Sequence, residues 1–306
     1  MKLSIIFSTF NRNDILTNTL QGLVDMNTTD LDWEVILVDN AGNKETASIA
    51  STFSSVLPLK FLVEKMPGKN NALNTALEHA TGELFIFTDD DIIADSAWVK
   101  SMLGAAERWP DCDLFGGRIL PKYPEGEAAP PINDKQFMSV AYVIADWNLP
   151  EGKHFPETKI WGPNMMVRRR VFDRDLRFNP DIGPNGSNYI MGSESDFLKR
   201  ARSEGYQELY VPTSLVYHQI RPEQLTHAWL YGRAFRLGRM IPYQGIRNLL
   251  KPDLKLRKWM LREIIRLLTR HTVFNLFGSE ANKLESGIEY NKLRGHIYQC
   301  FKRRNG

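Results

Sequence analysis

Residues 80–91 read ATGELFIFTDDD, an apolar run that ends in three consecutive aspartates. Leu84–Thr88 has the length and composition of a buried β-strand, and Asp89, Asp90 and Asp91 follow it directly. Adjacent carboxylates repel one another unless a cation or hydrogen-bond donors compensate, and hard oxygen ligands of this kind suit Mg²⁺ or Mn²⁺. The alternative is an acidic turn in which an aspartate caps the next helix.

The residues before this stretch alternate between two hydrophobic periods. Strands are expected at Leu3–Phe7, Trp33–Val38 and Leu59–Val63, with helices between them at Asn11–Leu23, Ala47–Phe53 and Asn70–His79. Continuous apolar strands separated by helices predict an α/β sandwich with a parallel sheet covered on both faces. Ligands of such sheets bind beyond the carboxyl ends of the strands. Residues 8–12, 39–42 and 89–91 all fall at those ends.

Two later segments also have a distinct pattern. Residues 121–157 are rich in Pro, Gly and charged residues, which suggests a loop or an insertion. Glu208–Val211 has the pattern of a strand that ends before Pro212.

Two further polar residues follow strands at this edge. Asp39 closes the second strand, where a carboxylate accepts hydrogen bonds from a base N–H or a ribose hydroxyl; a turn with Asn40 is the alternative. Lys69 follows Pro67 and Gly68 at the start of a helix, where a phosphate would meet both its ammonium and the helix N-terminal amides. A solvated loop lysine is the alternative reading of Lys69.

The charge of the chain is unevenly distributed. The 306 residues carry a net charge of +3, but residues 1–220 hold 21 basic and 30 acidic side chains, whereas residues 221–306 hold 18 basic and 6 acidic ones. Such asymmetry indicates a basic segment that faces an anionic surface. No nucleic-acid-binding module accompanies the charge, so nucleic acid is not expected as a partner.

The basic segment contains an amphipathic stretch, Lys255–His271. Its basic residues fall on one arc of a helix, beside Trp and Leu side chains, a composition typical of a helix that lies in a membrane interface. The alternative is an ordinary helix that packs on the rest of the protein. Only Cys112 and Cys300 are present, and no signal peptide or spanning segment is apparent. We therefore expect a cytoplasmic protein, peripheral on the cytoplasmic face of the membrane.

Several segments in a fixed order resemble a known family. The N-terminal ones are Ser4–Arg12 (SIIFSTFNR), Glu34–Gly42 (EVILVDNAG), Gly68–Asn74 (GKNNALN) and Ala80–Asp91. Together they resemble the nucleotide-sugar-binding half of family 2 glycosyltransferases, which have the GT-A fold. The resemblance continues through Ile160–Arg170 (IWGPNMMVRRR), Gly192–Gly205 (GSESDFLKRARSEG) and Tyr210–His218 (YVPTSLVYH), and so covers most of residues 1–240.

The resemblance implies a site for the donor nucleotide. Thr9 and Asn11 would lie beside the base, and Asp39 would hydrogen-bond the base or the ribose. The family often has an arginine just before Asn74, where this chain has Leu73. A phosphate contact would then come from Lys69 or Arg12.

The three aspartates would form the D-x-D motif of the family. Asp89 would lie near the ribose, with Asp90 between the two motif carboxylates, and Asp91 would coordinate Mn²⁺ or Mg²⁺ on the diphosphate. His218 occupies the place of a second metal ligand in this family; a structural imidazole is the alternative.

A general base is implied at the start of a later helix. The family often shows Glu-Asp at this place, and this chain has Ser193-Glu194-Ser195-Asp196. Glu194 matches the base position when counted back from the helix, and Asp196 is its rival. The alternative is that Ser193 caps the helix and the two carboxylates only favour its dipole.

The remaining implied residues line the sugar and acceptor pocket. Trp161, Gly162 and Asn164 match the corresponding family segment, although a core tryptophan is an equally good reading of Trp161. An indole face suits the C–H surface of a sugar.

The resemblance also divides the chain. Residues 1–115 would form the nucleotide-sugar-binding half and residues 116–220 the acceptor-binding half of one GT-A domain, a three-layer α/β sandwich with a mainly parallel sheet. Residues 221–306 would form a basic, helical extension.

The implied reaction is an inverting transfer from a nucleoside-diphosphate sugar, by family habit a UDP-sugar, to a hydroxyl of a glycan or a lipid-linked glycan. The alternatives are a sugar nucleotidyltransferase and a non-catalytic, membrane-associated protein that binds nucleotide sugars.

Overall fold

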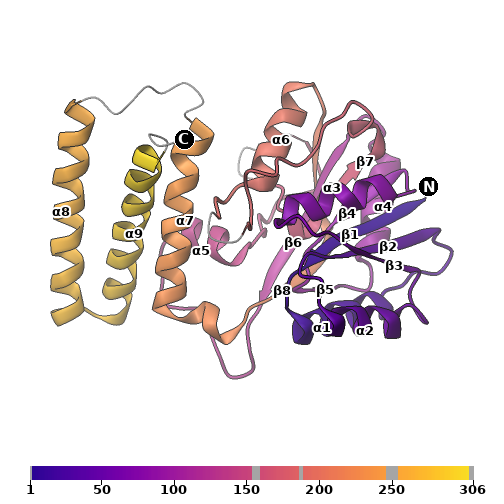
Figure 1. The fold of residues 1–306 in the computed structure, drawn as a ribbon, viewed down its shortest axis with the longest axis horizontal. Helices are drawn as coiled ribbons and strands as arrows, with labels where there is room; N and C mark the ends of the chain where they lie inside the picture. Colours follow the sequence, from indigo (N-terminus) through magenta and orange to yellow (C-terminus); the bar gives the residue numbers. More distant parts are fainter. Residues whose placement is uncertain (1, 154–158, 186–188, 246–253, 303–306) are drawn as a thin grey trace. The chain divides into compact units, whose positions relative to one another are not determined.

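The computed structural model describes residues 2–153, 159–185, 189–245 and 254–302 (Figure 1). Two compact units can be distinguished by their contacts. The first, here named the sheet unit, comprises Met1–Lys122, Val143–Asn188 and Gly192–Gln219. The second, here named the helical unit, comprises Tyr123–Tyr142, Tyr189–Met191 and Ile220–Gly306.

The N-terminal part of the sheet unit alternates strands and helices as predicted. Its elements are β1 (Leu3–Thr9), α1 (Asn13–Val24), β2 (Trp33–Asp39), α2 (Lys44–Phe53), β3 (Leu59–Val63), α3 (Lys69–His79) and β4 (Leu84–Phe87). The strands β3-β2-β1-β4 are adjacent in that order and parallel. Helix α2 begins three residues earlier than expected, because the Asn43 side chain caps it by accepting a hydrogen bond from the Glu45 N–H at 2.9 Å.

Alternate residues of the central strand pack on opposite faces of this sheet. In β1, Ile5 belongs to one core cluster, which includes Leu16 and Leu20 of α1. Its neighbour Ile6 belongs to the other cluster, with Ala72 of α3. Strand side chains alternate between the two faces, so a strand that is apolar at every position requires helices on both sides. The predicted three-layer sandwich is therefore confirmed.

The second part of the sheet unit extends the same sheet. Its elements are β5 (Ile92–Ala94), α4 (Trp98–Arg108), β6 (Leu114–Lys122), β7 (Met165–Arg168), α6 (Ser193–Ser203) and β8 (Glu208–Gln219). The full strand order is β3-β2-β1-β4-β7-β6-β8-β5. Strand β7 runs antiparallel to β4 and β6, and β5 runs antiparallel to β8, whereas β6 and β8 are parallel. The predicted mainly parallel sheet thus contains antiparallel pairs in its second half.

Strand β8 is longer than the sequence pattern predicted. The pattern ended this strand before Pro212, but the strand continues to Gln219 after a register shift. Val211 pairs with Gly117 and Leu215 with Arg118, so the three residues between them have no partner in β6. A proline is tolerated at such a bulge because no ladder hydrogen bond is needed there. The continuation pairs His218 with Ile92 of β5.

The helical unit is built from α5 (Lys135–Tyr142), α7 (His227–Gly245), α8 (Leu254–Phe277) and α9 (Glu280–Lys302). Helix α5 lies within the segment 121–157, which the sequence suggested was a loop or an insertion. Helices α7 and α8 each pack on α9, which lies between them in Figure 1. None of the helices in the described ranges has both the length and the apolar character needed to cross a bilayer.

Two glycines allow close contact between α7 and α9. A Cβ atom on Gly295 would lie 1.9 Å from the carbonyl oxygen of Phe235, and one on Gly238 would lie 1.9 Å from the carbonyl oxygen of Lys292. In both places the obstacle is backbone, which cannot move aside as the end of a side chain can. The approach of the two helices therefore depends on the missing side chains.

We expect Gly295→Ala to destabilise the helical unit by roughly 1–3 kcal/mol, because the added methyl group must separate the two helices. Hydrogen exchange of the α7 and α9 amides measures the effect. The matched control is Gly232→Ala on α7, where the nearest atom to a new Cβ is the end of the Arg236 side chain at 3.4 Å. Equal protection of these amides in both variants would contradict the packing argument.

Candidate functional site

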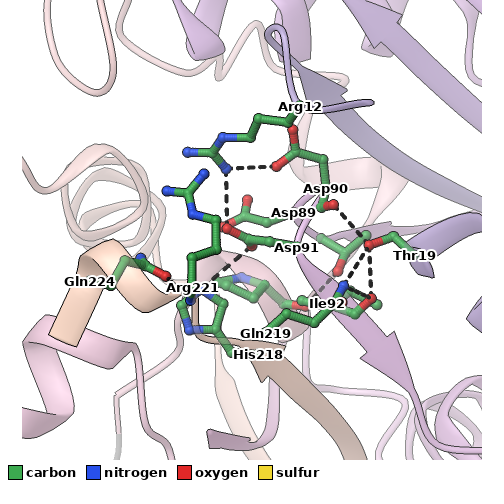
Figure 2. Close-up of polar contacts among 12 residues, drawn as sticks. Arg12, Thr19, Asp89, Asp90, Asp91, Ile92, His218, Gln219, Arg221 and Gln224 are labelled. Atoms are coloured by element: carbon green, nitrogen blue, oxygen red, sulfur yellow. Dashed lines mark hydrogen bonds and ion pairs between the residues drawn. The ribbon is translucent and has the colours of Figure 1, made fainter. Parts of the chain in front are cut away.

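The residues predicted at the strand ends meet around Asp90. Thr9, the last residue of β1, donates a hydrogen bond from Oγ1 to Asp90 Oδ2 at 2.7 Å. Arg12 donates from Nη1 to Asp90 Oδ1 at 2.8 Å (Figure 2). Asp90 is buried, so its carboxylate organises the loop after β1 from inside the protein.

Arg12 compensates part of the negative charge of the aspartates. Its Nη1 also lies 3.1 Å from Asp91 Oδ2. Burial raises the pKa of Asp90 to about 6, because Arg12 offsets only part of this effect while Asp91 and Asp89 add repulsion. Burial alone would lower the pKa of Arg12, but the three carboxylates outweigh it and raise that pKa. The cluster keeps excess negative charge, which favours a further cation.

Asp91 and His218 lie side by side on neighbouring segments. His218 Nε2 is 3.5 Å from Asp91 Oδ1, and the two side chains are 6% and 7% exposed. The adjacent backbone is tied together, since the Gln219 N–H donates to the Asp91 carbonyl at 2.8 Å. Figure 2 shows both side chains beside Gln219 and Thr19, the latter donating to the carbonyls of Asp90 and Ile92.

The Asp91–His218 pair provides ligand chemistry for a divalent cation. One oxygen and one imidazole nitrogen suit Mn²⁺, and two ligands of one ion with bonds of about 2.1 Å lie roughly 3 Å apart. The observed 3.5 Å separation fits that arrangement. In the part of the chain that is described, no group of three or more His, Cys, Asp or Glu side chains forms a complete metal site. The remaining ligands would be phosphate oxygens and water, as is usual for Mg²⁺ at substrate phosphates.

Lys69 connects the aspartates with the start of α6. Its Nζ lies 2.6 Å from Asp89 Oδ1 and 3.0 Å from Glu194 Oε1, and the lysine side chain is only 16% exposed. Burial alone would lower the pKa of Lys69, but Asp89 and Glu194 outweigh it and raise that pKa. Lys69 is therefore a charged link within the cluster and not a solvated loop lysine.

Glu194 and Asp196 have different surroundings, although both lie in the first turn of α6. A Cβ atom on Gly162 would lie 2.4 Å from Glu194 Oε1, so the Glu194 carboxylate contacts the Gly162 backbone. Asp196 instead pairs with Arg200 of the same helix at 2.9 Å. Only Glu194 of the two contacts Lys69 among the described residues.

Asp39 and Asn11 meet at the loop after β2. Asp39 is fully buried, and its carboxylate accepts hydrogen bonds from the backbone N–H groups of Ala41 at 2.8 Å and Asn43 at 2.6 Å. This is the turn-forming role that the sequence left open. Asn11 has a positive φ of 53° and accepts a hydrogen bond from the Asn43 side chain at 3.0 Å. Contact of either residue with a nucleotide stays a prediction.

Trp161 and Asn164 pack into the protein interior. Asn164 is fully buried; its Oδ1 accepts from Trp98 Nε1 at 2.8 Å, and its Nδ2 donates to the carbonyls of Arg118 and Ser214 at 2.9 Å each. Its side chain therefore supports the surrounding segment, and a contact of Asn164 with the sugar or the acceptor stays a prediction. Trp161 is half-buried against the core, and its buried indole N–H has no hydrogen-bond acceptor among the described residues.

Asn70, within the segment Gly68–Asn74, is a positioning residue that the sequence did not reveal. Asn70 donates from Nδ2 to the carbonyls of Asn179 at 2.6 Å and Ile182 at 2.9 Å, and accepts from Ser193 Oγ at 2.5 Å. These contacts fix the residue that precedes Glu194. The only signal in the sequence was its place beside Lys69. Leu73, which replaces an arginine of the family, is buried in the core.

The family model described as glycosyl transferase family 2 matches residues 4–176. Glycosyltransferase AglE of Haloferax volcanii is 25% identical over 239 residues, which are 77% of this chain and 71% of that protein.

Two solved structures are similar over nearly the whole chain. The mannosyltransferase PcManGT of Pyrobaculum calidifontis, in complex with GDP-Man and Mn²⁺, has a TM-score of 0.62 and 20% identity, covering 99% of this chain and 88% of that one. TarS residues 1–349 of S. aureus, in complex with UDP-GlcNAc, has a TM-score of 0.56 and 17% identity, covering 100% and 92%. At these identities the likeness shows the GT-A fold alone.

The family match covers more than half of the chain and contains the three aspartates, and the fold agrees with it. The chain therefore belongs to glycosyl transferase family 2 and is a glycosyltransferase.

Proposed function

We propose that this glycosyltransferase transfers a sugar from a nucleoside-diphosphate sugar to an acceptor hydroxyl with inversion, using Glu194 as general base. The observation that carries the proposal is the Lys69 bridge, 2.6 Å to Asp89 and 3.0 Å to Glu194. Through Lys69, the Glu194 carboxylate, which would take the proton of the acceptor hydroxyl, lies near Asp89, which would contact the donor. Sugar nucleotidyl transfer and a non-catalytic role are set aside, because the family consists of glycosyltransferases.

The surroundings of Glu194 support its role over that of Asp196. A general base must reach hydrogen-bond distance of the nucleophile. Glu194 lies against Gly162, which the family resemblance assigns to the sugar and acceptor pocket, whereas Asp196 is engaged by Arg200. Once the donor binds, Lys69 is drawn toward its phosphates, and Glu194 is then released to accept a proton.

The donor contacts are proposed for residues on the same edge of the sheet. They are Thr9, Asn11, Arg12, Asp39, Lys69, Asp89 and Asp90. Arg12 and Lys69 would exchange carboxylate partners for phosphate oxygens. A uridine nucleotide is our preferred donor; TarS was solved with UDP-GlcNAc, and PcManGT with GDP-Man.

Asp91 and His218 would hold Mn²⁺ or Mg²⁺. The bound ion would neutralise charge that develops on the leaving diphosphate, the usual contribution of a divalent cation to such a reaction. Their 3.5 Å separation supports this assignment, as does the grouping of three aspartates with only Arg12 and Lys69 as cationic partners in the contacts described above. The Mn²⁺ in PcManGT is consistent with use of a divalent cation.

A thermal-shift screen of nucleotide sugars, with and without Mn²⁺ or Mg²⁺, tests the proposal. We expect one nucleotide sugar to raise the melting temperature by several degrees with the metal and by less without it, because ligand binding to the folded state stabilises it. Hydrolysis of the same compound, measured as released nucleoside diphosphate, is the second readout. Stabilisation by none of them under any metal condition would contradict the proposal.

We also propose that the acceptor is a glycan or a lipid-linked glycan reached from the cytoplasmic face of a membrane, with α8 as the peripheral contact. One flank of α8 has exposed apolar side chains at helical spacing: Leu261, Ile265, Leu268 and Leu276. Exposed basic side chains occupy the adjacent arc, namely Lys258, Arg262 and Arg266. The opposite face holds the buried Met260 and Leu267, so the helix packs on one side and keeps an apolar flank on the other.

An anionic lipid surface suits this flank in both chemistry and charge. Apolar side chains beside arginines are the composition of an interfacial helix, and each basic residue near an anionic surface contributes about 1 kcal/mol. The net positive charge of residues 221–306 has the complementary sign.

We expect the protein to sediment with vesicles that contain phosphatidylglycerol at low salt, and less with phosphatidylcholine vesicles. The double variant Leu261→Glu, Ile265→Glu should lose this binding, because charges then replace the apolar flank. Val56→Glu, an exposed apolar position of the sheet unit, is the control and should bind as the unchanged protein does. If the protein binds neither kind of vesicle, the membrane is excluded as the partner of this flank. The same holds if the protein forms a dimer that the double variant disrupts.

A further inference from the structure

A cavity of about 530 Å³ opens within the helical unit, apart from the residues proposed for transfer. Its lining comes from α7, α8 and α9: aromatic side chains of Tyr231, Phe235 and Tyr290, and basic ones of Arg236, His271 and Arg294. Helices α7 and α8 contact α9 more extensively than they contact each other, which leaves room between them. This volume is large enough for a small organic molecule.

The cavity carries positive charge without a carboxylate. None of the residues that line it is Asp or Glu. Arg236 stacks on the Tyr189 ring at 5.4 Å, and its buried Nε has no hydrogen-bond acceptor in the described part of the chain. A buried donor without a partner is costly, so an acceptor that reached this N–H would stabilise the site. Burial also lowers the pKa of Arg236, with Arg233 adding repulsion.

Arg294 is held in place by its neighbours. Its Nη1 donates to Asn291 Oδ1 at 2.8 Å, and its guanidinium lies 5.5 Å from the Phe235 ring centre and 5.8 Å from that of Tyr290. A guanidinium has five N–H donors, so most remain for an acceptor. Because the Asn291 hydrogen bond and the two rings restrain the guanidinium before a ligand arrives, little freedom is lost on binding.

His271 contributes shape more than charge. Its Nδ1 lies 3.1 Å from Ser286 Oγ and its Nε2 lies 3.2 Å from Asn275 Nδ2. Burial lowers the pKa of His271, so the imidazole is neutral near pH 7. The attraction for an anion therefore rests on the two arginines.

We propose that this cavity is a binding site for an organic phosphate, whose anion lies on Arg236 and Arg294 and whose organic part lies against the aromatic rings. Guanidinium groups bind phosphate oxygens through paired N–H donors, which distinguishes this anion from a simple halide. Aromatic faces suit a sugar ring or the glycerol portion of a lipid. A soluble sugar phosphate and a phospholipid headgroup share this chemistry. Titration with one compound of each kind distinguishes them.

Isothermal titration calorimetry of the full chain with two probes tests the proposal. The probes are glucose 1-phosphate for a soluble ligand and dihexanoyl phosphatidic acid, below its micelle concentration, for a lipid. We expect saturable binding of at least one of them. Arg236→Gln combined with Arg294→Gln should weaken it tenfold or more, and Arg294→Lys should weaken it less, because the charge remains while the paired donors are lost.

Two controls separate a built site from general attraction of anions. Arg270→Gln removes a basic residue of α8 that pairs with Glu289 and does not line the cavity, and it should leave binding unchanged. Ala228→Trp fills the cavity at the exposed Ala228 while keeping both arginines, and it should abolish binding. Equal losses from Arg270→Gln and from the double arginine variant, or binding unaffected by Ala228→Trp, would overturn the proposal. So would the absence of binding to both probes.

The site is independent of the proposed transfer reaction. The double arginine variant should keep the metal-dependent stabilisation by a nucleotide sugar, which also shows that it folds. Loss of both properties together would mean misfolding, and Arg294→Lys then carries the test alone. Binding of glucose 1-phosphate only would assign a soluble phosphate, and binding of phosphatidic acid only would assign a lipid headgroup.

Discussion

Glu194→Gln is expected to lower the rate of sugar transfer by about 10²–10⁴-fold, while affinity for the nucleotide sugar changes little. The amide keeps the shape of the side chain, including its contact with Gly162, but it cannot accept a proton from the acceptor hydroxyl. The rate is measured as nucleoside diphosphate released from the donor that the thermal-shift screen identifies. Because the uncharged amide weakens the interaction with Lys69, donor affinity is measured in parallel.

Asp196→Asn is the matched control for this prediction. It removes a carboxylate two residues away on the same helical turn, and its expected effect is small because Asp196 pairs with Arg200. A larger rate loss in Asp196→Asn than in Glu194→Gln would transfer the role of base to Asp196. Full activity of both variants would exclude either carboxylate as the base.

Asp91→Asn is expected to lower kcat/KM by about 10²–10³-fold and to weaken the dependence of activity on Mn²⁺. An amide oxygen is a poorer ligand for a divalent cation than a carboxylate, and the leaving diphosphate would then be stabilised less. His218→Ala should shift the apparent Mn²⁺ affinity in the same direction, since both side chains would bind one ion. Activity titrated against Mn²⁺ concentration measures both effects.

The control for the metal prediction is Asp95→Asn. Asp91 directly precedes β5 and Asp95 directly follows it. The Asp95 carboxylate accepts a hydrogen bond from the Ala97 N–H at 2.9 Å, which asparagine can also accept. Its Mn²⁺ titration should match that of the unchanged protein. An unaltered Mn²⁺ titration in both Asp91→Asn and His218→Ala would contradict a shared ion. Asp91 also contacts Arg12, so a loss of activity without a change in the titration would point to Arg12 instead.

The parallel half of the sheet was predictable because its signals are local. Ile5 and Ile6 are adjacent apolar residues that face opposite sides, and a run of such residues has few other solutions in a folded protein. The position of Asp89–Asp91 follows in the same way from the apolar run Leu84–Phe87, which forms β4. Helix boundaries were less predictable where a side chain decides them, as Asn43 does for α2.

The predicted end of β8, before Pro212, was wrong, because the strand continues to Gln219. The prediction rested on the rule that a proline normally ends a strand. Here a bulge opposite Gly117 accommodates Pro212, and the strand resumes in a new register. Nothing local to residues 208–219 encodes that bulge, since it depends on the partner strand. The placement of His218 beside Asp91 depends on it in turn.

The sequence by itself determined the strand order in the chain, the burial of β1, β2 and β4, and the concentration of carboxylates after β4, because each follows from residues that are neighbours in the chain. The tertiary structure alone decided which charges meet. Lys69 and Glu194 are 125 residues apart, and Thr9 and Asp90 are 81 apart, yet both pairs are in contact. Such contacts depend on strand register and on helix packing across the sheet, which are set by the whole core at once.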